Sequence, residues 1–257
     1  MNYGMWIAAS SVSTNMYRHD VAANNLANVE TTAFKPDRVA VRARDAARVE
    51  DGLWFESSDE LIEKLGAGIM PTTPMLSLKQ GALKETGRPL DVAVEGKGFL
   101  VVQAGAGPGS ERLTRDGRLG VGPDGTLVHG ATGHPLLAAG GGRVRVDPNR
   151  PFEVRNDGAV FQDGVPMGAL RVANVPDTSV LGKTGEGLIG HRFGLPLELT
   201  PSAAAIRQHH VEQSTVDPIK AMLGVNSASR SAQGGLRMIG IIDANTSMAI
   251  SRLGRVG

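Results

Sequence analysis

Hydrophobic residues recur with a 3.5-residue period at both ends of the chain. The steps alternate between four and three through residues 5–26 and again through residues 221–253. This period keeps one narrow stripe facing a partner helix, so it predicts two long helices that form coiled-coil seams. The predicted N-terminal seam consists of Met5, Ala9, Val12, Met16, His19, Ala23 and Leu26. The predicted C-terminal seam consists of Ala221, Val225, Ala228, Ala232, Gly235, Ile239, Ile242, Thr246, Ala249 and Leu253.

The ends of both helices carry recognisable signals. The first helix should run from residue 3 to about Asn28, because β-branched residues and a proline follow. Two starts remain open for the second helix, at Ser202 or within Ser214–Pro218. Inside that helix, Gly234-Gly235 either kinks the chain or lets a neighbouring backbone come close.

The middle of the chain has a different character. Of the 34 glycines, 26 lie between residues 66 and 200, which excludes long helices there. The sequence has short β-type runs at Leu90–Val94, Phe99–Val102, Thr126–Val128, Val144–Val146, Ala159–Phe161 and Leu170–Val175. Asp-Gly pairs, which supply the positive φ angles of hairpin turns, occur at residues 116–117, 124–125, 157–158 and 163–164. Together these features predict an antiparallel all-β domain.

The predicted fold class is therefore α+β, mainly β, with an antiparallel all-β central domain between long, coiled-coil-forming terminal helices. We divide the chain into four segments. They are an N-terminal assembly helix and motif (1–35), a connecting segment (36–65), a β-rich globular domain (66–201) and a C-terminal assembly helix (202–257). Trp54 and Phe55 are expected to pin the connecting segment to the globular part.

Composition excludes several classes of function. The formal net charge is +1, so nothing selects for nucleic acid or an anionic membrane. Aromatic residues make up 4%, which is thin for a surface that stacks on sugars or bases, and the absence of cysteine removes thiolate chemistry. No apolar run reaches the ~18 residues of a membrane span, and no secretory signal is evident, so we expect no membrane insertion.

Candidate catalytic motifs fail on inspection. Gly182-Lys183-Thr184 ends like a phosphate-binding loop, but Asp177 stands where the leading glycine is needed. The histidines form no H-E-x-x-H pair, and adjacent His209-His210 is better explained as a solvated pair than as a metal site. We therefore expect no enzyme activity, no cofactor, no metal and no small-molecule substrate.

Four stretches carry a resemblance to a known family. Residues 20–35, which read D-V-A-A-N-N-L-A-N-V-E-T-T-A-F-K, closely resemble the signature of bacterial flagellar rod, hook and basal-body axial proteins. The segments 80–99, 113–128 and 211–222 resemble the central motif, the T-R-D-G…D-G-x-L-V region and the C-terminal element of that family. The resemblance covers nearly the whole chain and looks most like the rod proteins, of either the proximal or the distal rod.

Two departures from the family pattern are expected to have structural consequences. Ala33 stands where the family usually has glycine, so the turn there should be tighter or more helical. In residues 228–234 the usual aromatic is replaced by Ala232 and glycines follow, so helix packing there should be thinner.

The resemblance implies a structural subunit of the flagellar rod, the drive shaft that transmits torque for motility. Its expected partners are itself, other rod and hook axial proteins, and the flagellar export apparatus. Its expected location is the periplasm-spanning basal body, reached by flagellar type III export without a cleaved signal peptide. The alternatives are a hook-side axial protein or, in a different class, a β-rich extracytoplasmic glycan-binding or hydrolytic protein.

The predicted assembly interface combines the two seams with residues of the signature. Asn24, Asn25 and Asn28 either bond local backbone near a helix end or cross-link neighbouring subunits by hydrogen bonds. Phe34 is included as the aromatic residue of the signature.

Overall fold

The computed structural model describes residues 3–45, 66, 68–105, 107 and 109–253. Most of the predicted connecting segment, including Trp54 and Phe55, lies outside these residues, as does the side chain of Leu253. The chain forms two compact units. The first comprises residues 1–27, 37–74 and 217–257, and the second comprises residues 28–36 and 75–216.

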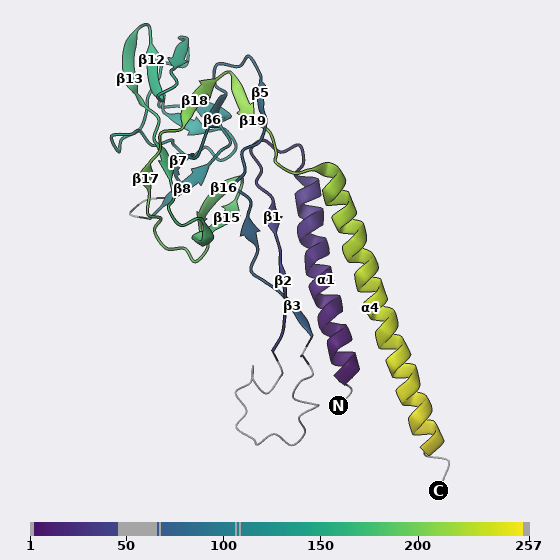
Figure 1. The fold of residues 1–257 in the computed structure, drawn as a ribbon. Coiled ribbons are helices and arrows are strands. Elements are labelled where there is room, and N and C mark those ends of the chain that lie inside the picture. The colour runs from purple at the N-terminus through teal and green to yellow at the C-terminus, as the bar shows by residue number, and fades with distance from the viewer. Residues whose placement is uncertain (1–2, 46–65, 67, 106, 108, 254–257) are drawn as a thin grey trace. The chain divides into compact units, whose positions relative to one another are not determined.

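The first unit is built on two long helices. Helix α1 spans Tyr3–Ala27 and helix α4 spans Pro218–Leu253 (Figure 1). The strands of this unit are β1 (Asp37–Arg38), β2 (Val41–Ala43) and β3 (Ile69–Pro71), of which β2 and β3 pair antiparallel. The pair of long terminal helices was predicted, and its second member begins at the later of the two open starts.

The local sequence explains where α4 begins. Asp217 Oδ1 accepts hydrogen bonds of 3.1 Å from the backbone N–H groups of Ile219 and Lys220, which caps the helix. Pro218 occupies the first helical position, where a missing N–H costs nothing. Residues 202–216 hold strands rather than a helix that begins at Ser202.

The second unit is made of short antiparallel strands. They are β4 (Met75–Leu76), β5 (Leu83–Glu85), β6 (Val92–Glu95), β7 (Phe99–Gln103), β8 (Glu111–Thr114), β9 (Leu119–Val121), β10 (Leu127–His129), β11 (Phe152–Val154), β12 (Ala159–Gln162), β13 (Val165–Ala169), β14 (Val172–Asn174), β15 (Leu181–Gly185), β16 (Leu188–His191), β17 (Thr200–Pro201), β18 (Ala205–Gln208) and β19 (His210–Glu212), with a short 3₁₀ helix at Thr178–Val180. The largest sheet has the order β15-β16-β8-β7-β14-β17, and β11-β12-β13 form a second sheet. Three pairs, β9–β10, β6–β18 and β5–β19, complete the unit.

Strand β7 lies at the centre of the core. Leu100 and Val102 belong to one buried cluster, whereas Phe99 and Val101 belong to the other. Because successive side chains of a strand point to opposite faces, both faces of β7 are buried, which accounts for its continuous apolar sequence. The predicted antiparallel β domain between terminal helices is thus confirmed.

Three of the four Asp-Gly pairs form the predicted hairpin turns. Residues 124–125 join β9 to β10, residues 157–158 join β11 to β12, and residues 163–164 join β12 to β13. The glycine has a positive φ in all three. The predicted strand Val144–Val146 is wrong, because this segment makes isolated bridges at Arg143 and Arg145 instead of a ladder, although Val144 and Val146 enter the core.

The fourth pair, Asp116-Gly117, does not form the predicted hairpin turn. A Cβ atom at Gly117 would lie 1.6 Å from the carbonyl oxygen of Val92, so this glycine permits a close backbone approach. The Asp116 carboxylate is buried and accepts hydrogen bonds from Arg118 Nε at 2.9 Å and Nη2 at 2.6 Å. Burial by itself would raise the pKa of Asp116, but hydrogen bonds from Arg118, the approach of His129 and the charge of Arg118 together outweigh it and lower that pKa to about 2.

This ion pair predicts a pH dependence of stability. A carboxyl group whose pKa is lowered by folding stabilises the native state above its unfolded pKa and loses that contribution as pH falls towards its folded pKa. For Asp116 the window runs from about pH 4 down to about pH 2, and the contribution lost is about 2 kcal/mol. Urea unfolding of the wild type and of Asp116→Asn, measured between pH 6 and pH 2, should show a smaller acid-dependent loss in the variant. Identical pH profiles would assign the acid sensitivity to other groups.

Candidate assembly interface

Helices α1 and α4 lie side by side and run in opposite directions (Figure 1). A Cβ atom at Gly224 would meet Ala22 at 3.5 Å, and one at Gly235 would approach Val12, so α4 descends along α1 from its C-terminal to its N-terminal end. The α4 positions that face α1 are buried or half-buried, and we call them the inner stripe: Ala221, Val225, Ala228, Ala232, Gly235, Ile239 and Ile242. Each of them is a predicted seam position.

Gly235 explains how the two helices come so close. Its Cβ, if present, would lie 2.5 Å from Val12 Cγ2 and 3.6 Å from the Ala8 carbonyl oxygen. At neighbouring Gly234, a Cβ would meet nothing within 4 Å. Helix α4 passes through both glycines without a break, so Gly235 serves the close approach of a neighbouring helix rather than a kink.

The N-terminal seam is rotated from its predicted position. Val12 is buried as expected, but Ala8 and Asn15 are the other buried residues on this side, whereas Ala9 and Met16 are exposed. The remaining predicted positions, Met5, His19, Ala23 and Leu26, are half-buried.

Strand β3 accounts for the rotation of α1. Thr14 Oγ1 donates a 3.1 Å hydrogen bond to the Ile69 carbonyl oxygen, and Ser10 Oγ accepts one of 3.3 Å from the Ile69 N–H. Helix α1 therefore packs on two elements at once, α4 and β3. The 3.5-residue period predicts the buried face of a helix that packs on a single partner helix. It does not predict the buried face of a helix that packs on two elements.

Two asparagines of the signature make hydrogen bonds within the chain, Asn25 to backbone and Asn28 to a side-chain hydroxyl. Asn25 Nδ2 donates to the Asp37 carbonyl oxygen at 2.9 Å, and Asn25 Oδ1 accepts from the Asp37 N–H at 3.1 Å. Asn28 Oδ1 accepts from Thr31 Oγ1 at 3.1 Å. Both residues therefore make local contacts within the chain, and cross-links to neighbouring subunits stay a prediction. Asn24 is exposed on α1.

The end of α4 continues beyond the start of α1 (Figure 1). Residues 243–252 are all exposed, including the predicted seam positions Thr246 and Ala249. Thr246 and Ala249 continue the period of the inner stripe, but within a single chain α1 is too short to cover them.

Large apolar side chains stay exposed along the helix pair. The exposed set on α1 is Trp6, Met16 and Tyr17, and on α4 it is Ile219, Met222, Leu223, Leu236, Met238, Ile241, Met248 and Ile250. So many large apolar side chains exposed on one pair of helices indicate an interaction site. The helix pair has therefore buried one seam and kept a second apolar surface for neighbours.

A buried ionic cluster in the second unit joins the segments that adjoin the two helices. Glu212 is 0% exposed and pairs with Lys35 Nζ and, at 3.1 Å, with Arg115 Nη1; these two cations are 2% and 4% exposed. Glu212 Oε1 also accepts a 2.7 Å bond from the Gly81 N–H. Lys35 follows α1 by eight residues, and Glu212 precedes α4 by six.

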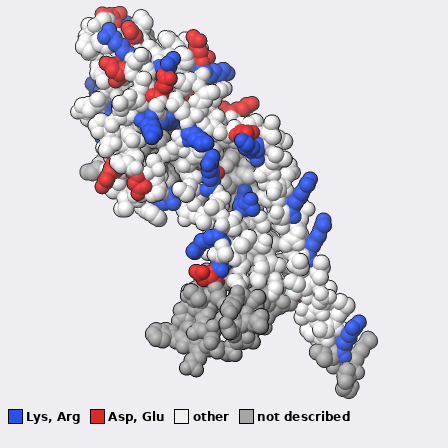
Figure 2. All heavy atoms as spheres, in the orientation of Figure 1, with Lys and Arg blue, Asp and Glu red and all other residues white. Residues whose placement is uncertain are grey.

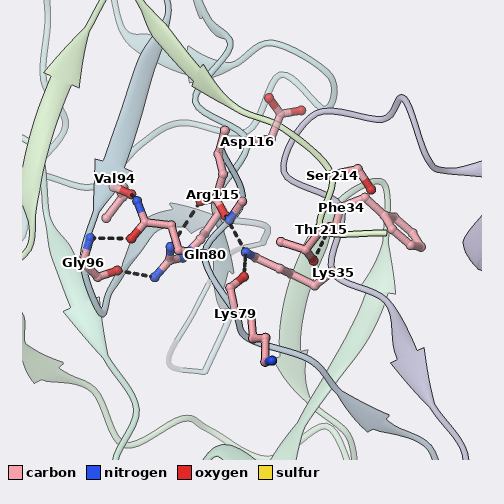
Figure 3. Close-up of polar contacts among 12 residues, drawn as sticks. Phe34, Lys35, Lys79, Gln80, Val94, Gly96, Arg115, Asp116, Ser214 and Thr215 are labelled. Atoms are coloured by element: carbon pink, nitrogen blue, oxygen red, sulfur yellow. Dashed lines mark hydrogen bonds and ion pairs between the residues drawn. The ribbon is translucent and has the colours of Figure 1, made fainter. Parts of the chain in front are cut away.

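Figure 3 shows Lys35 and Arg115 of this cluster among residues of the motif segments. Lys35 Nζ also donates to the Lys79 carbonyl oxygen, and Arg115 donates to the Gly96 carbonyl oxygen. Burial lowers the pKa of Lys35, although the hydrogen bond and the charge of Glu212 act in the opposite direction. Two buried cations thus depend on one carboxylate. The Lys183 ammonium lies 3.9 Å from the centre of the half-buried Phe34 ring, which adds a cation–π contact within the same unit.

Comparison with known proteins assigns the family. No protein-family model matches the chain. The flagellar basal-body rod protein FlgF of Caulobacter vibrioides is 32% identical over 260 residues, which cover all of both chains. The FlgF protein of Salmonella typhimurium is 28% identical over 97% of each chain, and a FlgG protein of Buchnera aphidicola is 29% identical over 93% of this chain and 95% of its own. This chain belongs to the flagellar basal-body rod protein family.

As a member of the rod protein family, the chain is a structural subunit of the flagellar rod and not an enzyme. Among the described residues, no helix combines the length and the apolar character that a bilayer crossing requires. Lys35, Arg115 and Glu212 all lie in stretches that carried the resemblance, but sequence analysis did not identify them, because other charged residues in the same stretches gave no reason to single them out.

The glycine pair in α4 offers a matched test of helix packing. Gly234→Ala should stabilise the helix pair by up to about 1 kcal/mol, because alanine favours a helix and finds open space there. Gly235→Ala gains the same propensity but pushes a methyl group into Val12, which costs about 1–3 kcal/mol. Thermal unfolding followed by far-UV circular dichroism should therefore rank Gly234→Ala above Gly235→Ala. The reverse order would show that α1 does not pack on Gly235.

The buried cluster predicts an asymmetry between its members. Glu212→Gln leaves Lys35 and Arg115 buried without a counter-charge and should cost about 3–5 kcal/mol of unfolding free energy. Lys35→Met leaves Glu212 paired with Arg115 alone, and an apolar side chain replaces one buried cation. Its loss of unfolding free energy should therefore be smaller than that of Glu212→Gln by at least about 2 kcal/mol. Urea unfolding of the two variants measures the difference, and equal losses would contradict the role of Glu212 as the shared partner.

Proposed function

We propose that the paired terminal helices are the element through which the subunit polymerises, with itself and with other axial proteins of the rod and hook. The observation that carries this proposal is the apolar surface that α1 and α4 leave exposed after packing on each other. Association of copies would remove that surface from water. The assembly surface comprises the outward apolar side chains of both helices, together with the seam positions that the helix pair leaves uncovered: Ala9, Met16, Thr246 and Ala249.

A filament requires a particular kind of contact. Two different patches that meet head to tail, without closing a ring, generate an open helical polymer. Helices α1 and α4 differ in sequence and present different outward faces, which suits such a heterologous contact. The small inner-stripe residues let the helices pack densely, as a shaft that carries torque requires.

We further propose that the subunit reaches the basal body through the flagellar export apparatus, without a cleaved signal peptide. The resemblance of its terminal segments to the axial family supports this route. The names of the aligned relatives favour the rod over the hook-side alternative. The glycan-binding or hydrolytic alternative is inconsistent with membership in a family of structural subunits.

The test is a truncation placed by the structure. Lys35 and Glu212 belong to the second unit, so the cuts should fall after Ala27 and after Asp217, which leaves residues 28–217. This fragment should remain soluble and folded but should not polymerise, whereas the full chain should form sedimentable filaments visible by electron microscopy.

A matched control removes residues 205–257, and with them β18, β19 and Glu212. It should lose the fold itself, because Ile206 and Glu212 are fully buried. Filaments formed by the 28–217 fragment would show that the terminal helices are not the assembly element.

A further inference from the structure

The helix pair carries an open hollow on one side. Its wall is mostly apolar, formed by Ala9, Val12, Met16 and Tyr17 of α1 and by Ile239 of α4, and its polar lining residues are Ser13 and Asp20. Met16 and Tyr17 are 56% and 37% exposed, so the hollow opens to solvent. It is also the place where two predicted seam positions of α1 remain uncovered.

Asp20 gives this hollow a negative charge. It is the single acidic residue in the sequence of α1, and its side chain is 78% exposed. The neighbouring His19 places Nδ1 3.3 Å from Asp20 Oδ1. A side chain that enters the hollow therefore meets mostly apolar walls and one carboxylate.

Helix α4 presents a complementary row on the side away from the inner stripe. Spacings of four and seven residues put its members on one helix face, and all of them are exposed. We call this row the outer stripe: Ile219, Leu223, Arg230, Arg237, Ile241, Met248 and Arg252. It combines four large apolar side chains with three cations and contains no acidic residue; Asp243, the single acidic residue in the α4 sequence, lies off it.

Figure 2 shows several Lys and Arg side chains that project from the helical unit, where the described surface is otherwise mostly uncharged. Arg237 and Ile241 are four residues apart, so one helix face offers an apolar side chain with a cation one turn away. This is the chemistry that the hollow and its carboxylate would accept.

From this complementarity we propose that the hollow receives the outer stripe of α4 from a second copy of the chain. Ile241 enters between Met16 and Ile239, and Arg237 pairs with Asp20. The hollow and the outer stripe are different patches on the same helix pair, so the contact is heterologous and can repeat without closing. This inference rests on the proposed function and adds to it the face, the partner segment and the charge pair.

The test is a charge swap in the full chain. Asp20→Arg and Arg237→Asp should each raise the critical concentration for polymerisation by about tenfold, because each puts like charges together at the contact. The double variant Asp20→Arg/Arg237→Asp restores an opposite pair and should return to within about threefold of the wild type. Far-UV circular dichroism should show the same helix content in all of them.

Two controls define the outcomes. Asp243→Arg changes the charge by the same amount as Asp20→Arg but lies off both patches, so it should polymerise as the wild type does. Rescue of Asp20→Arg by Arg230→Asp, rather than by Arg237→Asp, would overturn the proposed pairing. Single variants that polymerise normally, while the 28–217 fragment does not, would overturn the hollow and leave helix-mediated assembly intact. Polymerisation of that fragment would instead overturn the proposed function.

Discussion

One carboxylate, that of Glu212, holds together the segments that lead into both helices. It lies without solvent exposure between Lys35, which follows α1, and Arg115, which comes from the strand region, and it also accepts the Gly81 N–H. A buried charge of this kind is tolerable when every partner is in place and costly when one is lost. Within the second unit, the cluster therefore holds the segment that follows α1 against the segment that precedes α4.

The turn next to this cluster shows how firmly the geometry is set. Ala33 has φ of 55°, a left-handed conformation that glycine adopts freely and that costs an alanine roughly 1–2 kcal/mol. Its N–H donates a 2.8 Å hydrogen bond to the Glu212 carbonyl oxygen. The alanine was expected to make the turn tighter or more helical; instead the turn keeps the conformation that suits the family's glycine, because the hydrogen bond and the Lys35–Glu212 pair prescribe it.

The sequence predicted the structure correctly where a segment packs on a single partner element or depends on local φ preferences. The inner stripe of α4 could be read from its period because α1 is the element it packs on, and three Asp-Gly hairpins followed from local φ preferences. The sequence-based predictions failed where two different contacts act on the same segment. Helix α1 is rotated because Ser10 and Thr14 also bond β3, and Asp116-Gly117 is not a hairpin turn because its carboxylate pairs with Arg118 while its glycine lies against Val92. The contacts with Ile69 and Val92 join residues far apart in the sequence, and such contacts leave no periodic pattern in the chain.

Because α4 lacks the family's aromatic residue, we predicted that its helix packing would involve less side-chain volume. In the structure, the small residues allow α1 and α4 to approach closely. Ala228 and Ala232 are 2% and 9% exposed, and Gly235 admits Val12, so the two helices approach closely along small residues. The face of α4 that packs on α1 therefore carries small side chains. The large apolar side chains of α4 lie on its outward side, where Leu223, Ile241 and Met248 remain exposed. The two helices therefore pack closely on each other and expose apolar side chains on their outer surface. An isolated subunit gains little from that arrangement, whereas a packed array of copies gains from it at every contact.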